Sequence, residues 1–263
     1  MSILLFMRID FNHYGLIVFQ REWREMQRES SNNLLERFID DCISSDVDGC
    51  AVTSEEVRIQ RGSHHDRFGI LRKIAMGEST GLSNHRDRLH PDYKVILLDN
   101  NYMQAEKYGR LVHLFNSQAV RLQEGDEKIK VLIIGDNNFE DQKKFSETLE
   151  SLKDSQYIII PKKLSWHRGS AKNKGEARRI MYENENLYHA VVGFNAQEGI
   201  NWDMLNITES LLKPLVAVSN KHSFSGCETC IEIPNFQMNT SNEYTFLKSL
   251  KGSIYHGQFT AIE

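Results

Sequence analysis

The stretch from Pro161 to Arg179 carries the residues best suited to bind an anion. Its segment 162–179 is rich in Lys and Arg, and small residues interrupt it, so the backbone can approach a ligand while the cations suit a phosphate or polyphosphate. The candidate phosphate ligands are Arg168, Gly169, Ser170, Lys172 and Lys174. Two other interpretations stay open: a solvated basic loop that leads into a helix, and a nucleic-acid backbone site with Trp166 stacked on a base.

A second polar turn, Gly135-Asp136-Asn137-Asn138, follows an apolar run that starts at Lys130. Loops that leave the carboxyl end of a parallel strand often bind ligands, because helix amino-termini offer unpaired N–H groups there. Asp136 would repel a phosphate, and the chain lacks GxGxxG and GxxxxGK[ST], which argues against a nicotinamide dehydrogenase and a P-loop nucleotidase. The carboxylate could instead hold a ribose hydroxyl. A matching run starts 36 residues earlier, at Lys94, and there Asp99-Asn100-Asn101 could simply cap a helix.

Five short apolar runs in residues 93–220 are typical of strands buried on both faces. They are KVILLD, KVLIIG, QYIIIP, HAVVGF and PLVAVS, and helix-like segments separate them. This alternation predicts an α/β fold, with a Rossmann-like, mainly parallel sheet and helices on both faces. We expect this domain to span residues 93–263. Residues 1–92 are expected to form a separate α+β region with loops rich in Arg and His.

The third group of polar residues lies between two of these runs. Gly199-Ile200-Asn201-Trp202-Asp203 precedes a helix-like stretch, and Lys213-Pro214 precedes the next strand. This order is similar to the carboxyl half of nucleoside 2-deoxyribosyltransferases and the related SLOG superfamily. The segments VLIIGDNNFEDQKKFSETLESL and SWHRGSAKNKGEARRIM also resemble that superfamily, so the likeness covers about residues 130–220. The chain departs from it in lacking a glycine-rich loop between residues 150 and 165, and in having Ile200 and Asp203 where the family has Thr and Glu.

The resemblance implies a nucleotide or nucleoside pocket and chemistry at an N-glycosidic bond, by hydrolysis or transfer. It gives Asp203 the role of the carboxylate nucleophile at the sugar, a role that suits an oxocarbenium-like centre. The residues expected to hold the nucleotide or sugar are Gly135, Asp136, Asn138 and Asn195. Asp203 could equally be an ordinary acid in the first turn of a helix. The alternative function is a non-enzymatic nucleotide sensor, or a module that binds nucleic acid or protein through segment 162–179.

Composition limits the partners and the compartment. With 32 basic and 36 acidic residues the net charge is -4, so nothing in the overall charge requires a nucleic-acid partner. Four cysteines are too few for a secreted disulfide scaffold of 263 residues, so we expect a reducing, cytoplasmic setting, with no membrane span, no cofactor and no metal. A zinc site at His222, Cys227 and Cys230 is the metal alternative. The carboxyl-terminal strand leaves a homo-oligomer open.

Overall fold

The computed structural model describes residues 3–10, 34–44, 48–55, 67–78, 89–135, 139, 143–164, 174–195, 199–200, 202–208, 211, 213–218, 230–233, 248, 251–252 and 260–262. Its strands are β1 (Ile3–Asp10), β2 (Gly49–Glu55), β3 (Tyr93–Leu97), β4 (Tyr102–Lys107), β5 (Arg110–Glu124), β6 (Glu127–Ile134), β7 (Ile158–Leu164), β8 (Val191–Asn195), β9 (Gly199–Ile200), β10 (Leu215–Val218), β11 (Cys230–Ile233) and β12 (Thr260–Ile262). Its helices are α2 (Leu34–Ser44), α3 (Arg67–Ala75), α4 (Phe145–Ser151), α5 (Lys174–Glu183) and α6 (Trp202–Thr208), and a 3-10 turn covers Glu185–Leu187.

The architecture is a mixed α/β fold in which antiparallel pairing dominates. A nine-stranded sheet has the order β12-β11-β1-β2-β5-β4-β3, with β6 on β5 and β7 on β6, and a second sheet has the order β10-β8-β9. Among the described strands, only the pairs β1–β2, β2–β5 and β8–β10 are parallel. The predicted Rossmann-like, mainly parallel sheet is therefore wrong. Each of the five apolar runs does form a strand, but continuous apolar sequence indicates burial on both faces and says nothing about strand direction.

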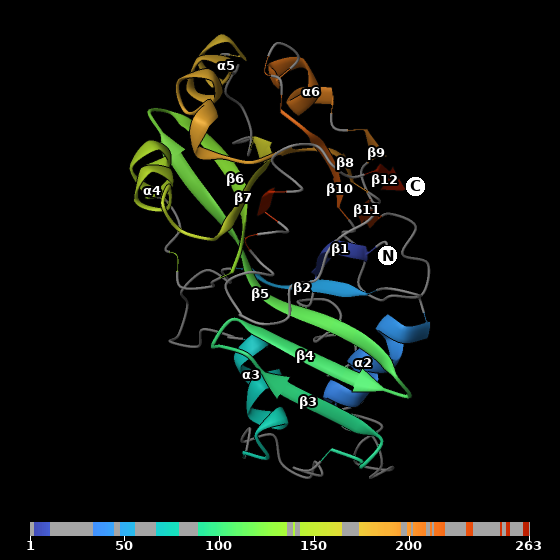
Figure 1. Ribbon diagram of the computed structural model, residues 1–263. Coiled ribbons are helices and arrows are strands. Elements are labelled where there is room, and N and C mark those ends of the chain that lie inside the picture. The colour runs from blue at the N-terminus through green and yellow to red at the C-terminus, as the bar shows by residue number, and fades with distance from the viewer. Residues whose placement is uncertain are drawn as a thin grey trace, which may run out of the picture.

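The long strand β5 connects the two halves of the molecule (Figure 1). Its residues 113–119 pair with β2, and this range overlaps both its pairing with β4 at 110–115 and its pairing with β6 at 117–124. Because a strand has only two edges, β4 and β6 must lie end to end along the edge opposite β2. The lower half of Figure 1 therefore holds β3 and β4 with α2 and α3, and the upper half holds β6 and β7 with α4 and α5.

Tight turns, and not helices, join the strands on either side of β5. The turn from β4 to β5 uses Tyr108 (φ 52°) and Gly109 (φ 78°), the two positive φ values that a type I′ hairpin needs. Gly125 (φ 57°) occupies the turn from β5 to β6. The helix expected after Asp99-Asn100-Asn101 is therefore replaced by β4 and this hairpin.

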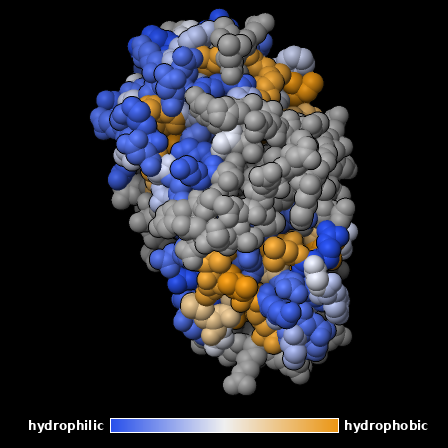
Figure 2. Space-filling view, viewed as in Figure 1, coloured by the Kyte–Doolittle hydropathy of each residue, from blue (hydrophilic) through white to orange (hydrophobic). Residues whose placement is uncertain are grey.

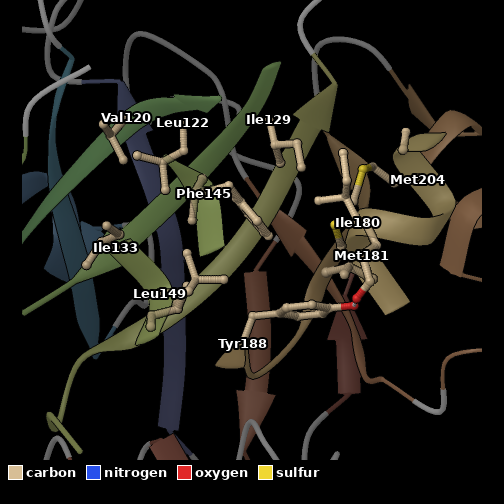
Figure 3. Close-up of a cluster of buried hydrophobic side chains, with 14 of the residues drawn as sticks. Val120, Leu122, Ile129, Ile133, Phe145, Leu149, Ile180, Met181, Tyr188 and Met204 are labelled. Carbon is tan, nitrogen blue, oxygen red and sulfur yellow. Dashed lines mark hydrogen bonds between the residues drawn. The ribbon is translucent and has the colours of Figure 1, made fainter. Parts of the chain in front are cut away.

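Two apolar clusters pack on the same face of β5, one in each half of the molecule. Val112 and Leu114 belong to the cluster that contains the buried side chains of α2 and α3. Val120 and Leu122 belong to the second cluster, with side chains from α4 and α5 (Figure 3). Alternate residues of a strand point to the same face, so the two clusters share one face but are separated by the middle of β5. That middle section is polar.

Candidate functional site

The structure describes only some of the residues that the sequence proposes for a site. Asp136, Asn138, Arg168, Gly169, Ser170 and Lys172 lie outside the described residues. Gly135 follows β6, Lys174 begins α5, Asn195 ends β8 and Asp203 is the second residue of α6. The zinc candidates His222 and Cys227 also lie outside the described residues, whereas Cys230 begins β11.

The strand directions separate two of the proposed site segments. Ile134, the last residue of β6, pairs with Ile158, the first residue of β7, and Ile129 pairs with Leu164. Gly135 therefore leaves the hairpin at its Ile158 end, and the basic segment that follows Leu164 leaves it at the other end. Six residue steps along β7 separate these ends by roughly 20 Å. A parallel sheet would have put both strand ends at one edge, and that expectation fails because β6 and β7 are antiparallel.

Basic residues form a row across β5, β6 and β7 at the Leu164 end of this hairpin. Arg121 pairs with Lys130, and Lys130 pairs in turn with Lys163. We call these three residues the basic row. Directly opposite residues such as Arg121 and Lys130 have their side chains close together in an antiparallel pair. Arg121 is exposed and Lys130 is half-buried, so the positive charge reaches the surface of the hairpin.

A β-bulge places one more lysine beside the basic row. The register between β6 and β7 shifts between Lys130 and Val131, since Val131 pairs with Pro161 while Lys130 pairs with Lys163. Lys162 is the extra residue, and it is only 4% exposed. A lysine this deeply buried is rare, and bulges re-aim side chains next to functional sites. Lys162 therefore lies beside the basic row, near the end of β7.

Asn116, in the polar middle of β5, bonds both to the first Asp-Asn-Asn turn and to Gly135. Asn116 lies where β4 and β6 meet: its N–H donates to Asn101 O (2.8 Å), and its carbonyl accepts from Gly135 N (2.8 Å). Its side-chain Nδ2 donates to Asn101 Oδ1 (2.8 Å). Asn101 of the first Asp-Asn-Asn turn and Gly135, which precedes the second in the sequence, thus both bond to one buried residue, which is 3% exposed. In the first of them Asp99 Oδ1 accepts a hydrogen bond from Asn101 N (2.6 Å), so this turn is stabilised locally without a following helix.

Two more polar residues in the middle of β5, Ser117 and Gln118, also form hydrogen bonds. Thr53 Oγ1 and Ser117 Oγ are 2.9 Å apart, and both residues are fully buried. Gln118 Nε2 donates to Phe139 O (2.8 Å), and Gln118 Oε1 accepts from Phe139 N (2.8 Å). These contacts hold Phe139 against β5 and explain the polar residues at the centre of the sheet as structural groups.

Sequence reasoning missed Arg121 and Lys130 as members of the site. The basic residues come from different strands, and only the register of the sheet brings them together. The alternation of Lys128 and Lys130 with Ile129 and Val131 was a usable signal, since a period of two predicts a strand with one charged face.

The hydropathy of the surface and of the described helices bears on contact with a membrane, and the arrangement of the described side chains bears on metal binding. Hydrophilic side chains cover α4 and α5, whereas an apolar surface lies over α6, where Trp202 is 64% exposed (Figure 2). No described helix is both long enough and apolar enough to cross a membrane. Within the described ranges, no three His, Cys, Asp or Glu residues are grouped so that they could hold a metal ion.

Comparisons with known proteins find likenesses in structure alone. No family model and no curated protein sequence matches this chain. The crystal structure of PsfC from Pseudomonas syringae PB-5123 is similar to it with a TM-score of 0.48 and 12% identity, over 86% of this chain and 81% of PsfC. A likeness at this level supports no statement about what the chain binds.

Proposed function

We propose that this protein binds a phosphorylated small molecule of the nucleotide class. The site lies on the adjacent strands β5, β6 and β7, at the end where β7 finishes with Leu164. The observation that carries the proposal is the basic row with the buried Lys162 beside it. In the sequence, β7 leads directly into the segment in which Arg168, Gly169, Ser170, Lys172 and Lys174 are predicted to hold phosphate. Arg and Lys both form charge-assisted hydrogen bonds to phosphate oxygens, so this group of basic residues suits a phosphate.

The nucleoside part of the proposal rests on the resemblance in residues 130–220. It would bring Asp203 to an N-glycosidic bond as the nucleophile, with Asn195 near the sugar. Asp136 and Asn138 are not part of this proposal, because β6 ends roughly 20 Å from the Leu164 end of β7. Asn195 ends β8 and Asp203 lies in α6, and these two elements contact each other. Cleavage or transfer at the N-glycosidic bond stays the finer prediction, and nucleotide sensing without turnover is its alternative. The buried thiols Cys42 and Cys50 suit the proposed cytoplasmic setting.

Binding of ATP, NAD and deoxynucleosides by isothermal titration calorimetry tests the proposal. The variants Lys130→Gln and Arg121→Gln should each weaken nucleotide binding by about tenfold or more, because a hydrogen bond to a charged group contributes about 1.5–3 kcal/mol. The matched control is Lys94→Gln, which removes an exposed cross-strand lysine that pairs with Glu106 (3.3 Å) in the other half of the molecule.

Four outcomes decide between the candidates. Loss of nucleotide binding in both variants, with binding retained in the control, supports the site. Nucleotide binding that is unchanged in both variants refutes it. Binding of single-stranded nucleic acid without binding of mononucleotides would favour the nucleic-acid module, whose affinity should fall steeply with salt. Release of free base from NAD or a deoxynucleoside, abolished by Asp203→Asn, would support the N-glycosidic reaction.

A further inference from the structure

Strand β3 ends the nine-stranded sheet, and among the described strands it has a neighbour on one edge alone. In the order β12-β11-β1-β2-β5-β4-β3 it pairs with β4. Figure 1 shows it as the outermost labelled strand of the lower half of the molecule. An open strand edge presents N–H and C=O groups that can pair with another chain. The basic row lies in the upper half, so this edge is a separate surface.

The backbone groups of Val95 and Leu97 point to this open edge. Leu98 N donates to Tyr102 O (3.1 Å), and these two residues continue the register of the β3–β4 pairs. Hydrogen-bonded pairs alternate with non-hydrogen-bonded pairs, so Ile96, two residues before Leu98, also directs its N–H and C=O groups to β4. Val95 and Leu97 direct theirs away from β4, and no described residue pairs with those groups.

The side chains along this edge are mainly apolar. Ile96 is 57% exposed, on the face of the sheet away from α2 and α3. Val95 and Leu97 are half-buried against the apolar cluster of the lower half. Figure 2 shows apolar side chains at the surface of that half. Lys94 is charged, and its Nζ is held by Glu106 (3.3 Å) on β4. Edge strands that avoid pairing carry charges along the edge, whereas this one exposes an isoleucine.

One antiparallel register makes β3 complementary to a second copy of itself. When Val95 lies opposite Leu97 of the second copy, each copy donates two backbone hydrogen bonds across the edge and accepts two. Ile96 then faces Ile96 of the second copy in a non-hydrogen-bonded pair, the position where side chains come closest. Lys94 lies opposite Leu98 of the second copy, so no like charges face each other.

The two neighbouring registers that keep this hydrogen-bonding pattern use groups that are already bonded. Centring the pair on Val95 would place Leu97 opposite Tyr93, whose N–H donates to His90 O (3.0 Å). Centring it on Leu97 would place Val95 opposite Asp99, whose N–H donates to a carbonyl in the turn after β3 (3.2 Å). The register centred on Ile96 needs neither of these groups, so it is the one that the edge favours.

We propose that β3 is a dimerisation edge, to which a second copy of this chain adds its own β3 in antiparallel orientation, with Ile96 at the two-fold axis. Such an interface is isologous, since the same residues contribute from both copies. The two nine-stranded sheets would join into one. An edge of five residues gives a small interface, so we expect a dissociation constant of about 1–100 µM. The proposal does not depend on the nucleotide site.

Sedimentation equilibrium of the full chain, from about 2 µM to about 500 µM, tests the proposal. The measured mass should rise from that of one chain to that of two. Ile96→Lys places like charges opposite each other and should raise the dissociation constant at least about tenfold. The matched control is Ile200→Lys, which makes the same change at a 47% exposed isoleucine of the smaller sheet and should leave dimerisation unchanged. Arg121→Gln/Lys130→Gln should dimerise as the wild type, whatever it does to nucleotide binding.

Mixing two charge variants tests the register itself. Ile96→Lys and Ile96→Glu should each dimerise weakly alone, because each faces its own charge. An equal mixture places Lys opposite Glu and should associate at least about tenfold more tightly than either variant alone. A further measurement needs no variant: amide hydrogen exchange of Val95 and Leu97 in the wild type should slow as the protein concentration rises, because the dimer bonds these N–H groups.

Three results would overturn the proposal. They are a wild-type mass of one chain at every concentration, dimerisation of Ile96→Lys at wild-type affinity, and a mixture of the Lys and Glu variants that associates no better than either alone. If the variants at Ile96 do not fold, the exchange of Val95 and Leu97 decides the question, and rates that do not change with concentration refute the pairing. If nucleotide binding fails while the mixture associates, the dimerisation edge still stands.

Discussion

Acidification should destabilise this protein through two buried histidines, His113 and His189. His113 is fully buried in the middle of the sheet, with its Nδ1 2.7 Å from the hydroxyl of Tyr102. Burial lowers the pKa of His113 to about 4 and is the main reason why the pKa of His189 falls to about 3. In the unfolded chain both pKa values return to about 6.5.

The size and sign of the effect follow from proton linkage. Between pH 6.5 and pH 4, an unfolded histidine binds a proton that the folded protein does not bind, so the free energy of unfolding falls as the pH falls. Above about pH 6.5 the stabilisation is complete. Going from about pH 7.5 to about pH 5 should cost about 2 kcal/mol for each histidine, or about 4 kcal/mol together. That is a large share of a typical total stability of about 5–15 kcal/mol.

Urea unfolding followed by circular dichroism, at several pH values from about 7.5 to about 5, measures this loss directly. The variant His113→Gln keeps a polar group opposite Tyr102 but does not titrate, so its loss should be about half that of the wild type. His113→Gln/His189→Gln should show little loss over the same range, and the control His90→Gln, which removes an exposed histidine, should behave as the wild type. Equal pH dependence in the wild type and His113→Gln, or a wild-type loss below about 1 kcal/mol, would refute the reasoning.

Three further predictions concern stability, and each is checked by urea unfolding at pH 7. Tyr108→Asn should stabilise the protein by about 0.5–1 kcal/mol, because Tyr108 is 78% exposed at φ 52° and Asn before Gly109 suits the type I′ turn; an unchanged or lower stability would contradict this. Phe145→Ala should cost about 3–5 kcal/mol, since Phe145 is fully buried in the cluster of the upper half, and a cost below about 1 kcal/mol would show that this cluster is not closely packed. Lys107→Met should cost about 1–3 kcal/mol, because Lys107 Nζ donates to Asp40 (2.6 Å) and the variant leaves that carboxylate without this partner; the same cost in an Asp40→Asn background would place the effect elsewhere.

The sequence by itself located five of the strands, at 93–97, 127–134, 158–164, 191–195 and 215–218, because short apolar runs bounded by polar turns favour strands. It did not locate β4 and β5, which lie where a helix-like segment was expected. It also did not show that β3 lies at the edge of the sheet, with alternate residues exposed. It also determined the basic composition of segment 162–179, and hence the expectation of an anion there. The helix α5 begins at Lys174, within that segment.

Only the tertiary structure decided how the strands pair and which polar residues meet. Residues 135–157 connect β6 to β7, and a connection of that length allows either direction, so the antiparallel pairing could not be inferred. The direction has consequences for the site, because it places Gly135 and the segment after Leu164 at opposite ends of the hairpin. The register of β5 and β6 likewise brings Arg121 beside Lys130. The tertiary fold brings Lys251 Nζ to 2.6 Å from Ser155 O, although the two residues are far apart in the sequence. These contacts join residues far apart in the chain, and no local pattern of residue types encodes them.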